Sequence, residues 1–208
     1  MTPTINRLLI LVGALLSYSE ATTASTNCGD EGVVLQILGS GGPFGAGRAS
    51  AGYIVWIDGE SRIMVDAGGG TFARFHEAGA NVSDLKVLAL SHFHPDHSSE
   101  VPALLWAQAS TLLIAGPSGN KNYPSLDRYL RALFAPPDGA FRVIGGYLEA
   151  ETVTVDAEAD EPTEVYSDGH ISIRGIGVPH SNVPTIGYSH YKPTWPITQN
   201  HVIRLIYC

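Results

Sequence analysis

The sequence contains few positive charges, few cysteines and only a short apolar run near its N-terminus. Its 12 lysines and arginines stand against 20 aspartates and glutamates, which gives a net charge of −8. Because such a chain repels phosphate backbones in general, we do not expect a dedicated nucleic-acid surface, although a local patch is compatible with this net charge. Cys28 and Cys208 can form at most one intramolecular disulfide, which an exported chain would permit. The nine apolar residues Leu8–Leu16 cannot cross about 30 Å of hydrocarbon as a helix, so no membrane span is expected.

The N-terminus has the pattern of a secretory signal peptide. Arg7 supplies a positive charge before Leu8–Leu16, and Ser19–Ala21 or Thr22–Ala24 offers small residues for cleavage. We therefore expect residues 1–24 to be a signal peptide and the protein to be exported, to the periplasm or to the medium. An uncleaved helix that packs on the domain is the alternative. Residues 30–208 are then expected to form one folded domain.

A dense cluster of metal-binding side chains follows the apolar stretch Leu85–Leu90. His92 and His94 are two residues apart, so on an extended backbone their rings point to one side and can share an ion such as Zn²⁺. Asp96 and His97 are offset from that pair and suit a second ion. The sequence therefore predicts a metal site at the end of a buried strand. A solvated polar loop is the alternative interpretation.

This cluster resembles the H-x-H-x-D-H signature of the metallo-β-lactamase-fold hydrolases. Three further elements agree in order. Ile63–Gly68 is similar to the strand-Asp-x-Gly element of the family, and Gly39–Pro43 is similar to the glycine turn of its ribonuclease Z and arylsulfatase-like branch. Val178–Ser181, followed by Gly187 and Tyr188, resembles the third metal motif of that branch. The resemblance runs from about Val33 to the last residue.

The resemblance implies an α/β fold of the metallo-β-lactamase type, an αββα sandwich. It implies two zinc ions, with manganese or iron as alternatives, and it makes His180 a further metal ligand beside the His92–His97 cluster. It also implies a bridging hydroxide as nucleophile, with Asp96 as the proton acceptor. The family has a later Gly-Asp element, whereas no Asp follows Asp168 here. The domain is therefore expected to be incomplete at its C-terminus.

The expected activity is that of an exported zinc-dependent hydrolase. Its substrate is expected to be a phosphodiester, sulfate ester or related ester of a small molecule. Nucleic acid is not favoured as a partner, because an exported, acidic protein would neither meet nor attract tRNA. A lactonase or β-lactamase-type hydrolase is one alternative, and a truncated, non-catalytic metal-binding fragment is another. The sequence is compatible with an oligomer.

Several other residues carry weaker signals. Asp66 lies at a strand end before a run of glycines, where its carboxylate can accept N–H bonds that hold the metal loop, or serve the fold alone. Gly41–Gly45 lacks the Lys-Ser/Thr of a phosphate-binding loop, so nucleotide binding is not expected there. The remaining histidines match no ligand motif: His76, His170, His190 and His201.

Hydrophobic periodicity and turn residues predict the order of strands and helices. Strands are expected at Val33–Leu38, Tyr53–Ile57, Arg62–Val65, Lys86–Leu90, Thr111–Ala115, Phe141–Ile144, Thr152–Val155, Glu164–Tyr166, Ile171–Val178 and Val202–Tyr207. Helices are expected over Thr71–Ala78, with Thr71 as a candidate N-cap, up to Ala109 with Ser98 or Ser99 as N-cap, and over Tyr123–Phe134. The segment Gly119–Glu149 is expected either to cover the substrate side of the site or to be a plain connection.

Overall fold

The structure is a computed structural model that describes residues 32–45, 47–108, 111–145, 150–169, 171–191 and 204–206. The expected signal peptide at 1–24, both cysteines, His170 and His201 lie outside the described residues. Among the described residues, no helix combines the length and hydrophobicity that a membrane crossing requires.

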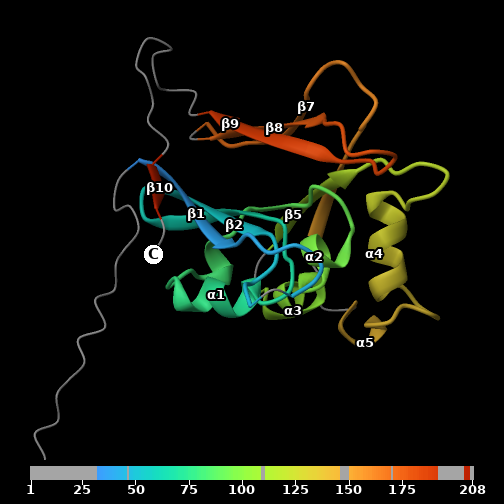
Figure 1. Cartoon of the computed structure of the whole chain (residues 1–208), viewed down its shortest axis with the longest axis horizontal. Coiled ribbons are helices and arrows are strands. Elements are labelled where there is room, and N and C mark those ends of the chain that lie inside the picture. Colours follow the sequence, from blue (N-terminus) through green and yellow to red (C-terminus); the bar gives the residue numbers. More distant parts are fainter. Residues whose placement is uncertain are drawn as a thin grey trace, which may run out of the picture.

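Two stacked sheets and a set of helices form the described structure (Figure 1). The larger sheet has seven strands in the order β10-β1-β2-β3-β4-β5-β6. Its strands are β1 (Val33–Gly39), β2 (Gly52–Ile57), β3 (Glu60–Val65), β4 (Val87–Ala89), β5 (Leu112–Pro117), β6 (Ala150–Val155) and β10 (Arg204–Ile206). The smaller sheet has three strands, β7 (Thr163–Ser167), β8 (Ser172–Gly177) and β9 (Ile186–Tyr191).

The helices lie against the face of the larger sheet that is turned away from the smaller sheet (Figure 1). They are α1 (Thr71–Glu77), α2 (Pro95–Ser98), α3 (Val101–Ala107), α4 (Leu126–Phe134) and α5 (Arg142–Gly145), with a 3₁₀ turn, η1, at Val82–Asp84. The layered α/β sandwich predicted from the sequence is confirmed. In the described part of the chain it consists of one helical layer and two sheets.

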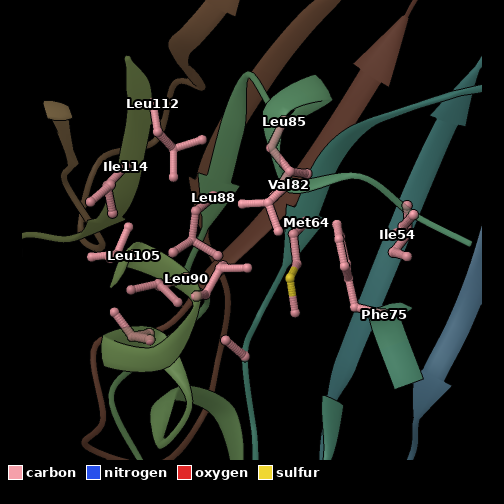
Figure 2. Close-up of a cluster of buried hydrophobic side chains, with 14 of the residues drawn as sticks. Ile54, Met64, Phe75, Val82, Leu85, Leu88, Leu90, Leu105, Leu112 and Ile114 are labelled. Atoms are coloured by element: carbon pink, nitrogen blue, oxygen red, sulfur yellow. The ribbon is translucent and has the colours of Figure 1, made fainter. Parts of the chain in front are cut away.

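Alternating side chains of the larger sheet divide between two apolar cores, because successive residues of a strand point to opposite faces. Leu88 packs with Met64 and Phe75 in the core between the larger sheet and the helices, as Figure 2 shows. Val87 and Ala89, its neighbours in β4, pack against the smaller sheet. All three residues of β4 are completely buried, which explains why this strand has no polar alternation.

The pairing of β3 and β4 places the segment that begins at Asp66 beside the segment that begins at Ser91. The hairpin between β2 and β3 turns at Asp58 and Gly59, whose φ angles of 48° and 83° are those of the tight turn that Asp-Gly favours. Strand β3 then pairs with β4 in parallel, with Val65 opposite Ala89. Because parallel strands end at the same edge of a sheet, the segments that begin at Asp66 and at Ser91 become neighbours.

Three local expectations were wrong. In place of the helix predicted from Ser98 or Ser99 onward, the structure has two helices, α2 and α3. Neither serine is an N-cap, and the Ser98 hydroxyl donates a hydrogen bond to the His94 carbonyl oxygen instead. Most of the strand predicted at Phe141–Ile144 belongs instead to the short helix α5, since three apolar residues within a four-residue segment do not by themselves distinguish strand from helix. Thr71 is the first residue of α1 and not its N-cap, which is Gly70.

Candidate metal centre

The chain changes from extended to helical conformation within the His92–His97 cluster. His94 has β-region angles, φ −64° and ψ 147°, and Pro95 begins α2. Proline suits the first helical position because its φ is already helical and its missing N–H is not needed there. His92 and His94 therefore project from an extended segment, and Asp96 and His97 project from a helical turn. This change of conformation is the physical origin of the offset between the two pairs.

The alternation of the extended segment separates the imidazoles from the hydrophobic core. Phe93, between the two histidines, points the other way and stacks on Tyr129 of α4, with ring centroids 4.3 Å apart and planes inclined by 4°. His92 and His94 consequently share one side, and the Nε2 atom of His92 lies 3.2 Å from the Nδ1 atom of His94. The two-residue spacing thus has the effect predicted from the sequence.

The third imidazole comes from the segment after β8. His180 is exposed, and its ring centroid lies 4.9 Å from that of His92. One nitrogen from each of His92, His94 and His180 lies within 4.8 Å of the others. A tetrahedral zinc ion with Zn–N bonds of about 2.0–2.1 Å separates its ligand nitrogens by about 3.4 Å, so a small closure of this triad suffices to hold an ion. The three histidines converge as predicted, and their role as metal ligands stays a prediction.

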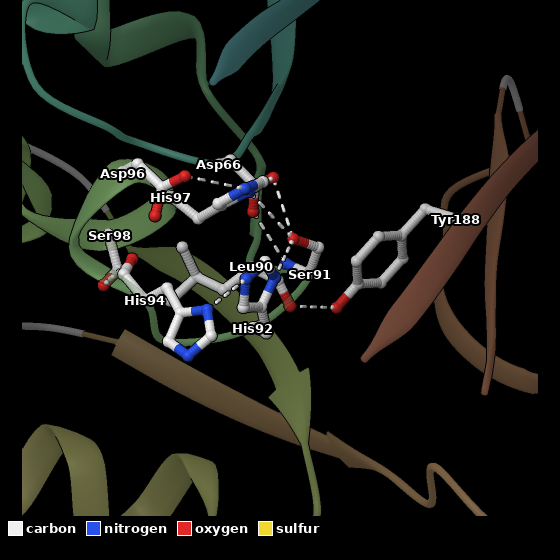
Figure 3. Close-up of polar contacts among 9 residues, drawn as sticks. All are labelled: Asp66, Leu90, Ser91, His92, His94, Asp96, His97, Ser98 and Tyr188. Carbon is white, nitrogen blue, oxygen red and sulfur yellow. Dashed lines mark hydrogen bonds and ion pairs between the residues drawn. The ribbon is translucent and has the colours of Figure 1, made fainter. Parts of the chain in front are cut away.

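Hydrogen bonds around Ser91 determine which nitrogen of His92 is available (Figure 3). The Ser91 hydroxyl donates to Asp66 Oδ2 over 2.8 Å, and the oxygen of this hydroxyl, Ser91 Oγ, lies 3.0 Å from His92 Nδ1. Because the only hydrogen of that hydroxyl goes to Asp66, His92 Nδ1–H is the donor in the second contact. The lone pair of His92 is then on Nε2, which faces the triad. His92 Nε2 lies 3.2 Å from His94 Nδ1. If both nitrogens present lone pairs, they repel each other unless a proton or a cation lies between them.

Electrostatics favour the neutral, metal-binding form of His92. Its side chain is 4% exposed, and burial, followed by the neighbouring imidazoles of His97, His94 and His180, lowers its pKa to about 4. Metal ions require deprotonated ligands, so a histidine that stays neutral near pH 7 offers its lone pair without competition from a proton. The donor set of the triad therefore fits a divalent transition metal such as zinc.

Asp66 is the buried anchor of the loop. It is 3% exposed, and it accepts hydrogen bonds from the Ser91 backbone N–H at 2.7 Å and from the Ser91 hydroxyl. His97 Nδ1 lies 2.7 Å from its Oδ2 atom. Burial alone would lower the pKa of His97, but the hydrogen bond and charge of Asp66, together with the charge of Asp96, raise it. The expectation that Asp66 holds the metal loop agrees with these contacts.

Asp96 and His97 face each other beside the triad. His97 Nε2 lies 3.6 Å from Asp96 Oδ2, and the His97 ring centroid is 4.1 Å from that of His92. Because Asp66 occupies Nδ1, the nitrogen of His97 that remains for an ion is Nε2, on the side of Asp96. The proposed second ion and the proton-accepting role of Asp96 stay predictions.

Two contacts from β9 support the metal loop, and no motif in the sequence predicts them. Tyr188 donates from its hydroxyl to the Leu90 carbonyl oxygen at 3.0 Å, and the Ile186 backbone N–H donates to the Ser91 carbonyl oxygen at 2.9 Å. Burial, and then the charge of Asp66, raises the pKa of Tyr188 well above its ordinary value, so this phenol remains a donor. The smaller sheet thereby holds the end of β4. Strand β9 itself was not predicted from the sequence.

The site opens into a polar groove at His180. Residues 119–122, 157–160 and 177–185 line this groove, which has a volume of about 730 Å³. The Asn120 side-chain amide donates to the Asn182 carbonyl oxygen at 2.9 Å and connects two of these segments. Lys121 contributes a cation, and Glu158 and Asp160 contribute carboxylates.

Two of the four other histidines, His76 and His190, fall within the described residues. His76 is exposed on α1, where its ring meets the edge of Phe72 at 4.7 Å. His190 lies on β9, beside an apolar cavity of about 400 Å³ between the two sheets, and burial lowers its pKa. Neither belongs to the group of three converging histidines.

Comparisons with known proteins agree with this fold. The model of the Metallo-beta-lactamase superfamily matches residues 45–174. The ribonuclease Z of Agathobacter rectalis is 32% identical over 134 residues, which cover 62% of this chain and 39% of that protein. The ribonuclease Z of Thermobifida fusca is 24% identical over 151 residues, which cover 70% of this chain and 42% of that protein. The chain thus spans about two fifths of the length of these curated relatives.

Two solved structures share the fold at low sequence identity. The short form of human tRNase Z superposes with a TM-score of 0.58 at 16% identity, covering 77% of this chain and 65% of that one. The metallo-beta-lactamase fold protein YhfI from Bacillus subtilis superposes with a TM-score of 0.53 at 18% identity, covering 77% of this chain and 59% of that one.

One expectation from the sequence is contradicted by these relatives. We expected a small-molecule ester as substrate and no nucleic acid, whereas the curated relatives are ribonucleases. The net charge of −8 is a sum over the whole chain, and it says little about the local surface and site cations that meet a substrate. The resemblance to the ribonuclease Z branch is confirmed, and so is the expected metal-dependent hydrolase family. The chain belongs to the metallo-beta-lactamase superfamily.

Proposed function

We propose that this protein is a metal-dependent hydrolase that cleaves a phosphodiester bond of RNA. The observation that carries the proposal is the convergence of His92, His94 and His180, with Asp96 and His97 beside them, at the open end of two parallel strands. The ribonuclease Z relatives supply the substrate class.

Each side chain of the centre has a distinct task in this proposal. The three converging histidines hold one ion, and zinc is the ion proposed because neutral imidazoles suit it. Asp96 and the Nε2 atom of His97 hold a second ion, and Asp96 accepts the proton of the attacking water. When bound, the ions polarise the phosphoryl oxygens and lower the pKa of a water molecule. Asp66 keeps His97 in the orientation and tautomer that this arrangement needs.

The groove beside His180 is the proposed path of the RNA. It begins at a member of the triad, and its lining is polar, with asparagine side chains and backbone groups that can pair with base edges. Its one lysine is outnumbered by Glu158 and Asp160, so the groove is proposed to contact bases and riboses more than phosphates. The scissile phosphate would be held by the metal centre itself.

Export is a separate proposal, and it depends only on the N-terminal sequence. The charge at Arg7, the apolar run Leu8–Leu16 and the small residues after it have the order of a cleavable signal. N-terminal sequencing of the protein recovered from the periplasm and the medium tests it. Recovery of the protein with Met1 retained inside the cell would contradict export.

The test of the proposed function is a ribonuclease assay with a matched pair of variants. The full chain is incubated with a labelled, structured RNA, after strong chelation and after addition of Zn²⁺ or Mn²⁺. We expect cleavage only with metal, and loss of cleavage in His92→Ala but not in His76→Ala, which removes a histidine outside the triad. Undiminished cleavage in strong chelator would rule out metal catalysis, and cleavage of a simple phosphodiester reporter with no cleavage of RNA would refute the substrate class.

A further inference from the structure

A carboxylate outside the metal centre joins the two loops that build it. Glu100 lies between α2 and α3, three residues after His97, and its side chain reaches across to the start of α1. Its Oε1 atom accepts the Gly70 backbone N–H at 2.7 Å, and its Oε2 atom accepts the Phe72 backbone N–H at 2.6 Å. The Thr71 hydroxyl lies 3.2 Å from the same Oε2. The two backbone N–H groups belong to the N-terminal end of α1, for which the helix itself offers no acceptor, whereas the Thr71 hydroxyl also donates to the Gly68 carbonyl oxygen at 2.7 Å.

Glu100 also holds the beginning of the segment that leads into α1. Its backbone N–H donates to the Ala67 carbonyl oxygen at 2.8 Å. The segment from Asp66 to Gly70, here called the glycine loop, is thus bound near one end by the main chain of Glu100 and at the other end by its carboxylate. Because Ala67 and Gly70 are only three residues apart, one residue holds this short loop from both sides.

The glycine loop in turn touches the proposed ligands of the second ion. Its Ala67 N–H donates to the His97 carbonyl oxygen at 2.7 Å, and Asp66 binds the His97 ring. Gly68 packs so closely on Asp96 that a Cβ atom on it would lie 2.0 Å from the Asp96 carbonyl oxygen. With no side chain between the two backbones, a shift of the loop is transmitted directly to Asp96 and His97.

From these contacts we infer that Glu100 is a positioning residue of the metal centre. Through the glycine loop, Glu100 fixes the positions of Asp66, Asp96 and His97 relative to one another. The inference rests on the proposed function for its catalytic consequence. The hydrogen bond between Asp66 and His97 can be observed without metal, so the inference can fail or succeed independently.

The test compares Glu100→Gln with Glu77→Gln in the full chain. Both changes remove one carboxylate charge, but Glu77 is exposed on α1 and pairs only with Arg74 in the contacts described for it. In ¹H–¹⁵N spectra of the metal-free protein, we expect the His97 Nδ1–H signal to exchange with water at least about tenfold faster in Glu100→Gln and to be unchanged in Glu77→Gln. Zinc affinity, measured by competition with a chromophoric chelator, should fall by about 10–100-fold in Glu100→Gln alone.

Glu100→Asp provides the conservative comparison. It keeps the charge but is one methylene shorter, so it should restore part of the proton protection and part of the zinc affinity, and it serves as the test variant if Glu100→Gln does not fold. A lower melting temperature with unchanged His97 exchange and unchanged zinc affinity would show a merely structural role and overturn the inference. Absence of zinc binding by the unsubstituted chain would instead contradict the proposed function, while the His97 signal would still decide the inference.

Discussion

Replacement of Asp66 by asparagine tests the buried network most directly. The backbone at Asp66 has a φ of 57°, in the left-handed region, which asparagine tolerates about as well as aspartate. The side chains are nearly equal in volume, so neither backbone strain nor a cavity contributes to the effect. What changes is the hydrogen bonding at Oδ2, which serves both the Ser91 hydroxyl and His97 Nδ1.

The expected cost follows from these two contacts. An amide NH₂ in place of Oδ2 opposes two donors, and hydrogen bonds to a charged group contribute roughly 1.5–3 kcal/mol each. Rotation of the Ser91 hydroxyl and relief from burying a charge recover part of the sum. We therefore expect Asp66→Asn to lower the free energy of unfolding by about 3 kcal/mol, a large part of the roughly 5–15 kcal/mol that a domain has.

Urea unfolding of the metal-free protein at pH 7 measures this loss. Asp127→Asn is the control, because Asp127 is exposed and pairs with Arg131 one helical turn away. Such surface pairs contribute about 0.3–0.5 kcal/mol. A loss below about 0.5 kcal/mol for Asp66→Asn, equal to that of the control, would refute the assignment of Asp66 as the anchor of the loop.

Three further outcomes are expected. His180→Ala should weaken zinc binding by at least about tenfold in a chelator competition, whereas His76→Ala should leave it unchanged, because His180 completes the triad and His76 is not part of it. Since burial and neighbouring imidazoles lower the folded-state pKa of His92 from 6.5 to about 4, its contribution to the stability of the metal-free fold is present above pH 6.5 and is lost as the pH falls from there through about 4. Urea unfolding between pH 7 and pH 4 should therefore show a shallower loss in His92→Gln, and an unchanged pH profile would contradict the assigned cause. Tyr188→Phe, which removes the hydroxyl that binds the Leu90 carbonyl oxygen, should cost about 1 kcal/mol in the same assay, and no measurable change would argue against that support.

Local patterns in the sequence determined several parts of this protein. The apolar run before Ser91 forms the strand β4, buried on both faces, and Asp58-Gly59 forms the turn between β2 and β3. The two-residue spacing of His92 and His94 places their rings on one side. These features depend on residues close together in the chain, so periodicity and turn chemistry suffice to predict them.

The family resemblance already implied that His180 joins the histidine cluster, but the tertiary structure decided the other contacts between distant groups. Asp66 and Ser91 are 25 residues apart in the chain, and Glu100 lies 28 residues from Phe72, yet each pair is joined by a short hydrogen bond. No periodic pattern encodes such contacts, because they arise only when β3 and β4 pair in parallel and bring their following loops together. The same limit applies to substrate class: net charge is summed over the whole chain, whereas the groove beside His180 is built from three segments that only folding assembles.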